Sequence, residues 1–157
     1  MEIDRILAPT DFSENSKQAI EYARELAQTF GAKLLLLHVI EVPPYPIEGL
    51  PPGPLGGSFL EALEQQLTSD LAQLLANDAE VEVVRRVVIG IPYSKIVEVA
   101  AAEKVDLIAM ATHGPTRFNQ LIMGRVAERV VHTAPCPIWT IHPRRRDSLA
   151  VPARFKG

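Results

Sequence analysis

The chain is 157 residues long, with 47% hydrophobic residues, 22% charged residues and a formal net charge of −3. This composition excludes a disordered chain, and no apolar run approaches the ~18 residues that a membrane span needs. The charge is uneven, since residues 144–157 carry +4 and residues 1–143 therefore carry −7, and such an acidic body argues against general nucleic-acid binding.

Two apolar segments with a helical pattern between them open the chain. Residues 3–8 predict a short strand that ends at residues 9–11 (PTD). Ser13 is a suitable N-cap for a helix whose apolar residues recur at spacings of three and four until Gly31 stops it. Residues 33–40 (KLLLLHVI) are continuously apolar, as expected for a central strand of a parallel sheet covered on both faces.

A segment rich in proline and glycine follows. Of residues 43–57, ten of the fifteen are Pro or Gly, a composition that no helix or inner strand tolerates. We interpret residues 42–58 as a long surface loop within one domain, because neither flank is a complete domain. Ser58 and Glu61 form a capping box for the next helix, and leucines at helical spacing between residues 60 and 74 predict a stripe that faces the core.

The second half of the chain continues the alternation of strands and helices. Residues 80–89 suit a less protected strand, because two arginines interrupt them. Pro92 stands where a first-turn proline begins a helix, and residues 106–111 (DLIAMA) predict a second buried strand. Residues 121–133 predict the last helix. Prolines on both sides of residues 138–141 place this final strand at an edge of the sheet.

Strands separated by helices predict one doubly wound, mostly parallel sheet with helices on both faces. In such sheets, ligands bind beyond the carboxyl ends of the strands, where the strand order reverses. Polar residues follow the first strand at residues 9–11 and the fourth at residues 112–114. If these two strands are neighbours, their exit loops build one crevice.

The cellular compartment is predicted from two absences in the sequence. The N-terminus, with Glu2, Asp4 and Arg5, does not have the basic and then apolar pattern of a signal peptide. Cys136 is the only cysteine, so an internal disulfide is excluded, and no Cys/His cluster has zinc spacing. We therefore expect a cytoplasmic protein without a bound metal.

Six short motifs stand in a fixed order along the chain. They are residues 6–13 (ILAPTDFS), 37–40 (LHVI), 90–92 (GIP), 111–114 (ATHG), 124–130 (GRVAERV) and 134–137 (APCP). Together they resemble the universal stress protein family, and the resemblance runs from about residue 3 to residue 142.

The resemblance implies a single domain over residues 1–143 with the adenine-nucleotide α-hydrolase-like fold, a five-stranded parallel sheet in the order 3-2-1-4-5. It implies a homodimer, commonly formed by antiparallel pairing of the last edge strand, here Ile138 to Ile141. It also implies an ATP-binding regulator of a stress response with a protein partner that the sequence does not identify. The basic tail over residues 144–157 is expected to be disordered.

Nucleotide-binding members of this family carry Gly, two residues, Gly, nine residues, and then Gly followed by Ser or Thr. The corresponding residues here are Ala111, Gly114, Gly124 and Arg125. Asp11 matches an acidic residue that contacts ribose or adenine, and Val39 matches a position that packs on the base. The candidate nucleotide-binding residues are Pro9, Thr10, Asp11, Val39, Ala111, His113, Gly114, Gly124, Arg125 and Val126.

Two positions depart from the family motif. Ala111 adds only a methyl group at a strand end, whereas Arg125 replaces a hydroxyl with a long cation. The guanidinium of Arg125 either clamps a phosphate with two hydrogen bonds or fills the groove and blocks it. The cofactor expected in the first case is ATP, with or without Mg²⁺. In the second case the protein is a dimeric interaction module that binds no nucleotide.

Structural alternatives exist for the candidate residues. Asp11 is also a suitable cap for the following helix, and Gly114 and Gly124 are also suitable turn and packing glycines. His113 has no evident carboxylate or nucleophile partner, so a structural or ligand-edge role is favoured over general base catalysis. A slow ATPase ranks last, because the chain has no Walker-type phosphate loop, and no catalytic residue is predicted.

Overall fold

The computed structural model of the chain describes residues 2–41, 57–113 and 123–142. Three predicted features lie outside the described residues: the proline-rich loop up to residue 56, Gly114, and the basic tail over residues 144–157. Within the described residues, no helix combines the length and the apolar character that crossing a membrane requires.

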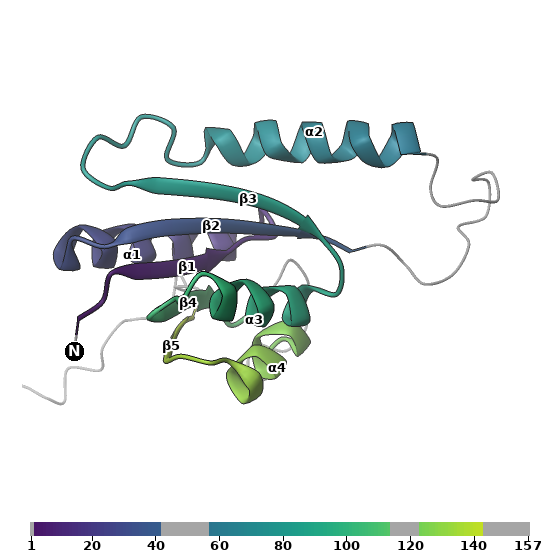
Figure 1. Ribbon diagram of the computed structural model, residues 1–157. Coiled ribbons are helices and arrows are strands. Elements are labelled where there is room, and N and C mark those ends of the chain that lie inside the picture. The colour runs from purple at the N-terminus through teal and green to yellow at the C-terminus, as the bar shows by residue number, and fades with distance from the viewer. Residues whose placement is uncertain (1, 42–56, 114–122, 143–157) are drawn as a thin grey trace, which may run out of the picture.

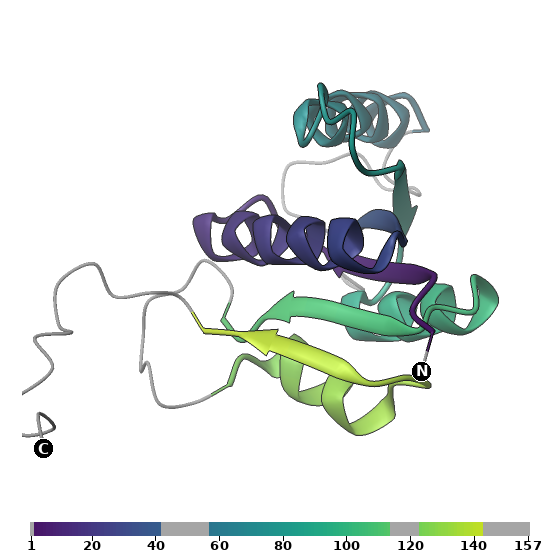
Figure 2. The same ribbon diagram turned by 90° about the vertical axis from the view of Figure 1, so that its left-hand side faces the viewer.

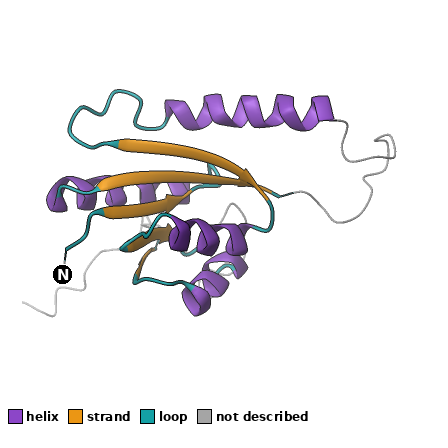
Figure 3. Cartoon of the chain, viewed as in Figure 1, coloured by secondary structure: helices purple, strands orange, loops and turns teal. Residues whose placement is uncertain are grey.

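Strands and helices alternate along the described chain (Figures 1 and 3). The elements are β1 (Arg5–Pro9), α1 (Glu14–Phe30), β2 (Lys33–Ile40), α2 (Gly57–Gln73), β3 (Val83–Ile89), α3 (Pro92–Ala102), β4 (Leu107–Ala111), α4 (Arg125–Thr133) and β5 (Ile138–Ile141). The strands form one parallel sheet in the order β3-β2-β1-β4-β5. The predicted fold class and strand order are therefore confirmed.

The sheet separates two apolar cores, because successive side chains of a strand point to opposite faces. Leu34 and Leu36 of β2 pack in the core that α1 covers, together with the C-terminal part of α2. Leu35 and Leu37 pack in the core that α3 and α4 cover. Figures 1 and 2 show α1 on one side of the sheet and α3 with α4 on the other. This double coverage explains why the β2 segment is continuously apolar.

Helix α1 begins and ends at the predicted residues. The side chain of Ser13 accepts a hydrogen bond from the backbone N–H of Ser16, as an N-cap does. Gly31 ends the helix in the left-handed conformation with φ 67°, which glycine adopts without steric cost. The helix therefore starts directly after the loop that follows β1, at the carboxyl edge of the sheet.

Helix α2 differs from the prediction in its start and in its packing. It begins at Gly57, so Ser58 lies in the first turn and the predicted capping position is wrong by at least one residue. Of the predicted leucine stripe, only Leu71 is fully buried (1% exposed). Figure 1 shows that the N-terminal half of α2 extends past the end of the sheet. The leucines of that half are only partly buried, because the sheet does not reach beneath them.

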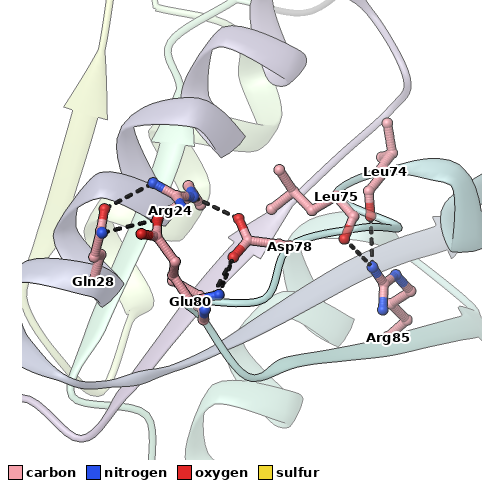
Figure 4. Close-up of polar contacts among 8 residues, drawn as sticks. Arg24, Gln28, Leu74, Leu75, Asp78, Glu80 and Arg85 are labelled. Atoms are coloured by element: carbon pink, nitrogen blue, oxygen red, sulfur yellow. Dashed lines mark hydrogen bonds and ion pairs between the residues drawn. The ribbon is translucent and has the colours of Figure 1, made fainter.

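The C-terminal end of α2 is held by an arginine from the neighbouring edge strand. Arg85 of β3 donates hydrogen bonds to the carbonyl oxygens of Leu74 and Leu75, at 2.7 and 3.0 Å (Figure 4). It also donates to the carbonyl oxygen of Leu71 at 3.2 Å. Leu71 lies in the last turn of α2, and Leu74 and Leu75 directly follow the helix, where carbonyls lack the i+4 partners of a helix interior. The arginine that interrupts the apolar pattern of β3 therefore serves as a cap.

An ion-pair cluster joins α1 to the turn before β3 (Figure 4). The guanidinium of Arg24 donates to the carboxylates of Asp78 and Glu80 and to Gln28. The other oxygen of Asp78 accepts the backbone N–H groups of Glu80 and Val81, at 3.0 and 2.9 Å. Because these N–H groups bond within the turn, β3 begins at Val83 and not at Glu80 as predicted.

The start of β1 is held in a similar way. The carboxylate of Asp106, directly before β4, accepts the backbone N–H groups of Asp4 and Arg5 at 2.9 and 3.0 Å. Strand β1 therefore begins at Arg5, two residues after the predicted start at Ile3. Both side-chain anchors lie at the amino-terminal edge of the sheet.

Candidate functional site

A cavity of about 790 Å³ lies at the carboxyl ends of the central strands. Strands β1 and β4 are paired neighbours at the point where the strand order reverses, as the predicted crevice requires. The cavity is lined by nine of the ten candidate residues: Pro9, Thr10, Asp11, Val39, Ala111, His113, Gly124, Arg125 and Val126. The tenth, Gly114, lies outside the described residues.

The loop after β1 forms one wall of the cavity and is held by its own side chains. The backbone N–H of Thr10 donates to the carbonyl of Leu37 at 2.8 Å, which ties the loop to β2. The buried hydroxyl of Thr10 lies 2.9 Å from that of Ser16. Asp11 does not cap α1 itself, because one of its oxygens accepts the N–H of Ser13, the actual N-cap, at 2.9 Å. Asp11 therefore supports the cap from outside the helix.

Phe12 holds the loop in an unusual backbone conformation. Its φ of 63° lies in the left-handed region, which costs a bulky residue on the order of 1 kcal/mol. Its ring packs on the imidazole of His38, with 4.7 Å between the centroids. The Nδ1–H of His38 donates to the carbonyl of Thr10 at 2.8 Å, so His38 is a paired, partly buried histidine, as its place in an apolar strand favours.

The loop after β4 carries a hydroxyl between two imidazoles. Thr112 is completely buried, and its Oγ1 lies 2.8 Å from Nδ1 of His113 and 3.1 Å from Nδ1 of His142. The Nε2 of His113 is also buried, yet it has no hydrogen-bond partner among the residues that the structure describes. An unpaired buried nitrogen costs about 1 to 3 kcal/mol, so a ligand that accepts a hydrogen bond from His113 would recover this cost.

The N-terminus of α4 forms the wall after β4. Gly124 is its N-cap and has no side chain to accept the first-turn N–H groups. The N–H of Gly124 donates to the carbonyl of Thr112 at 2.7 Å, which draws the helix start against the end of β4. The positive end of the helix dipole therefore faces the cavity region, as an anion site requires.

Arg125 adds a full positive charge at this helix end. Its side chain is exposed, and it lines the cavity. No hydrogen bond or ion pair joins the Arg125 side chain to another residue of the described ranges 2–41, 57–113 and 123–142. Its guanidinium thus forms no ion pair with a carboxylate that the structure describes.

Sequence reasoning missed part of the cavity wall. The further lining residues are Ser16, Leu37, His38, Glu41, Pro92, Ile96, Met110, Thr112, Met123 and Ala127. Of these, Thr112 belongs to the strand exit at residues 112–114 that was predicted to build the crevice, and position at the carboxyl end of a strand would also have identified Glu41. The apolar members carry no such signal, because their spacing equals that of ordinary core residues. Among the residues that the structure describes, no group of three or more His, Cys, Asp or Glu side chains is arranged to hold a metal.

The strand order, the helices on both faces and the cavity at the strand reversal define an α/β protein with the adenine-nucleotide α-hydrolase-like fold. The chain belongs to the universal stress protein family, whose family model matches residues 2–142. A universal stress protein of Methanocaldococcus jannaschii is 31% identical to it over 145 residues, which cover 91% of this chain and 84% of that relative.

Solved structures have the same fold. The universal stress protein UspA from Lactobacillus plantarum superposes with a TM-score of 0.74 at 25% identity, covering 90% of this chain and 99% of that chain. Two more distant structures, each 19% identical, are complexes with a nucleotide. One is a universal stress protein bound to cAMP (TM-score 0.66, 92% of this chain and 100% of that chain). The other is the Archaeoglobus fulgidus protein bound to dAMP (TM-score 0.62, 90% and 99%).

Proposed function

We propose that this chain is a regulatory protein of a stress response that binds an adenine nucleotide in the cavity between β1 and β4. The expected physiological ligand is ATP. The observation that carries the proposal is the convergence of nine motif residues, from four separate segments, on the wall of one cavity. The volume of about 790 Å³ lies within the range of about 300 to 1,000 Å³ that is typical of small-molecule sites.

The chemistry of the lining supports the same ligand class. Val39, Ile96 and Met110 supply apolar surface for a flat base. Asp11 and Glu41 supply carboxylate oxygens that accept hydrogen bonds from an amino group or from ribose hydroxyls. The uncapped start of α4 supplies backbone N–H groups for a phosphate. The ligands in the complexes of related proteins, cAMP and dAMP, each contain a base, a sugar and a phosphate.

Isothermal calorimetry of nucleotide-free protein with ATP tests the proposal. We expect a micromolar dissociation constant, about −8 kcal/mol, and adenine nucleotide in the supernatant of freshly purified, denatured protein. Asp11→Asn should weaken binding about tenfold, since it removes the charge but keeps an oxygen for Ser13. Glu14→Gln is the matched control, because Glu14 lies on the exposed face of α1 and outside the cavity. Absence of heat at millimolar nucleotide would contradict the proposal.

The active form is proposed to be a homodimer that pairs through β5. This strand lies at the edge of the sheet beyond β4, and its Trp139 is 51% exposed. An exposed tryptophan on an unpaired strand edge is the kind of surface that a second copy covers. The assignment of residues 1–143 to one domain, the cytoplasmic location and the disordered tail stay predictions.

Sedimentation velocity with Trp139→Lys tests the dimer. The wild-type protein should sediment as a dimer at micromolar concentration, and the variant as a monomer, because a lysine on the edge strand disfavours pairing. Val131→Lys, at an exposed apolar residue of α4, is the control and should remain dimeric. Because Trp139 is the only tryptophan, its emission should shift to longer wavelength as the wild-type protein is diluted. An unchanged sedimentation coefficient for Trp139→Lys would place the interface elsewhere.

A further inference from the structure

The charged groups of the cavity are separated onto two sides. Among the described lining residues, the carboxylates are Asp11, after β1, and Glu41, after β2. The one arginine, Arg125, begins the helix that follows β4. Because the sheet order is β3-β2-β1-β4-β5, the two carboxylates share one side of the cavity and Arg125 stands on the other.

This separation of charges fixes the orientation in which a polar ligand binds in the cavity. The side of β1 and β2 accepts hydrogen bonds and disfavours an anion. The side of α4 carries the guanidinium together with the positive end of a helix whose N-cap has no side chain, so it favours an anion. A ligand with a neutral hydrogen-bonding part and an anionic part therefore places its anionic end against Arg125.

A divalent cation does not fit this anionic end. Mg²⁺ needs oxygen ligands in octahedral geometry and is held in proteins by one or two carboxylates in addition to phosphate oxygens. Both described carboxylates of the cavity lie on the opposite side. One oxygen of Asp11 is also occupied by the N–H and the hydroxyl of Ser13. The described residues at the start of α4, Gly124 and Arg125, offer nitrogen donors, which bind phosphate but repel a metal ion.

Arg125 supplies what a metal ion would supply. A guanidinium is charged at every physiological pH and presents parallel N–H groups that match two phosphate oxygens. The family hydroxyl that it replaces carries no charge, so only the arginine neutralises a phosphate by itself. No described carboxylate pairs with it.

We propose that Arg125 binds the phosphate of the nucleotide directly in place of a divalent cation, so that this site prefers metal-free adenine nucleotides to their Mg²⁺ complexes. This inference rests on the proposed nucleotide-binding function. Arg125 alone would then explain why the site needs no Mg²⁺ and why it binds the nucleotide in its metal-free form.

Calorimetric titration with ADP, once with EDTA and once with excess Mg²⁺, tests the inference. The wild-type protein should bind at least as tightly in EDTA as in Mg²⁺. Arg125→Ser, which restores the family hydroxyl, should bind tenfold or more weakly in EDTA and should regain affinity when Mg²⁺ is added. Arg125→Lys should fall between them, since it keeps the charge but loses the paired N–H groups.

Arg129→Ser is the matched control. Arg129 lies one turn further along α4, and its guanidinium stacks on the ring of Tyr93 at 4.6 Å and does not line the cavity. Its loss should leave both affinities and their ratio unchanged.

Two results would overturn the inference and leave the proposed function standing. They are a wild-type protein that binds ADP only with Mg²⁺, and an Arg125→Ser variant that binds more tightly than wild type in EDTA, which would make the arginine a block. If neither protein binds ADP under either condition, the inference and the proposed function both fail.

Discussion

The two edges of the sheet differ in how completely the polar groups of the described residues are paired. At the amino-terminal edge, Asp106 accepts two backbone N–H groups, and Asp78 accepts two more while it pairs with Arg24. At the carboxyl edge, the Nε2 of His113 is buried without a partner, and Arg125 has none among the described residues. Among the described residues, the buried side-chain nitrogen without a partner thus lies at the carboxyl edge.

The difference indicates which polar groups serve stability and which serve binding. A paired group adds to the free energy of unfolding, whereas an unpaired buried group lowers it until a ligand satisfies it. The left-handed backbone of Phe12, in the loop at the cavity wall, likewise lowers the free energy of unfolding. Substitutions at the amino-terminal edge should therefore change the free energy of unfolding, and those at the carboxyl edge should change nucleotide affinity.

The largest effect is expected from Asp106→Ala. Two N–H groups at the start of β1 would lose their acceptor, and the free energy of unfolding should fall by about 2 kcal/mol. Urea denaturation measures the loss, and Asp106→Asn, which keeps an oxygen, should recover most of it. Nucleotide affinity should stay unchanged in both variants. A parallel loss of affinity would show that the two edges are not independent.

A smaller effect, largest at neutral pH and lost in acid, is expected from Asp78→Asn. The hydrogen bond from Arg24 holds the pKa of Asp78 below its usual range. The carboxylate therefore stabilises the fold above its unfolded-state pKa, and this contribution disappears as the pH falls through the lower folded-state pKa. Urea midpoints measured from neutral to acidic pH should decline less steeply in the variant. Equal acid slopes for wild type and variant would exclude Asp78 as a source of the decline.

His113→Met is expected to preserve or raise the free energy of unfolding, whereas the two substitutions above lower it. The variant removes an unpaired buried nitrogen, while the Thr112 hydroxyl keeps His142 and the carbonyl of Ile141 as partners. Stability should be unchanged or rise by up to about 1 kcal/mol, and nucleotide affinity should fall. His132→Met, on the exposed side of α4, should change neither. A destabilisation of the His113 variant by more than about 2 kcal/mol would show that this histidine is structural.

The smallest net change is expected from Phe12→Gly. Glycine relieves the left-handed strain but loses the contact with His38, and these opposing contributions should leave the free energy of unfolding within about 1 kcal/mol of wild type. Phe12→Ala keeps the strain and loses the same contact, so its urea midpoint should be lower than that of the glycine variant. The reverse order would show that Phe12 is not strained in solution.

The helices and strands could be predicted because their determinants are local, whereas the strand order came from the family resemblance. The continuous apolar run of β2, the cap at Ser13 and the stop at Gly31 are patterns that a few neighbouring residues create. The position of the cavity followed from the polar residues at two strand exits, since parallel topology brings such exits together.

The remaining features depend on contacts between distant residues. Arg24 and Asp78 are 54 residues apart in the chain, and no periodicity marks such a pair. The overhang of α2 was not predicted either, because a leucine stripe indicates an apolar face but not how far the sheet extends beneath it. The left-handed Phe12 has no sequence signature, since that conformation is rare for an aromatic residue.

The hydroxyl of Thr112 has one hydrogen, yet it lies within bonding distance of two imidazole nitrogens. If a ligand accepts a hydrogen bond from the Nε2–H of a neutral His113, the Nδ1 of that ring is unprotonated. Nδ1 then accepts the hydrogen bond from the Thr112 hydroxyl. His142 must then carry its own hydrogen on Nδ1 in order to meet the same oxygen. The tautomers of the two rings are thus interdependent, and the placement of one hydrogen in the cavity is transmitted to the residue that follows β5.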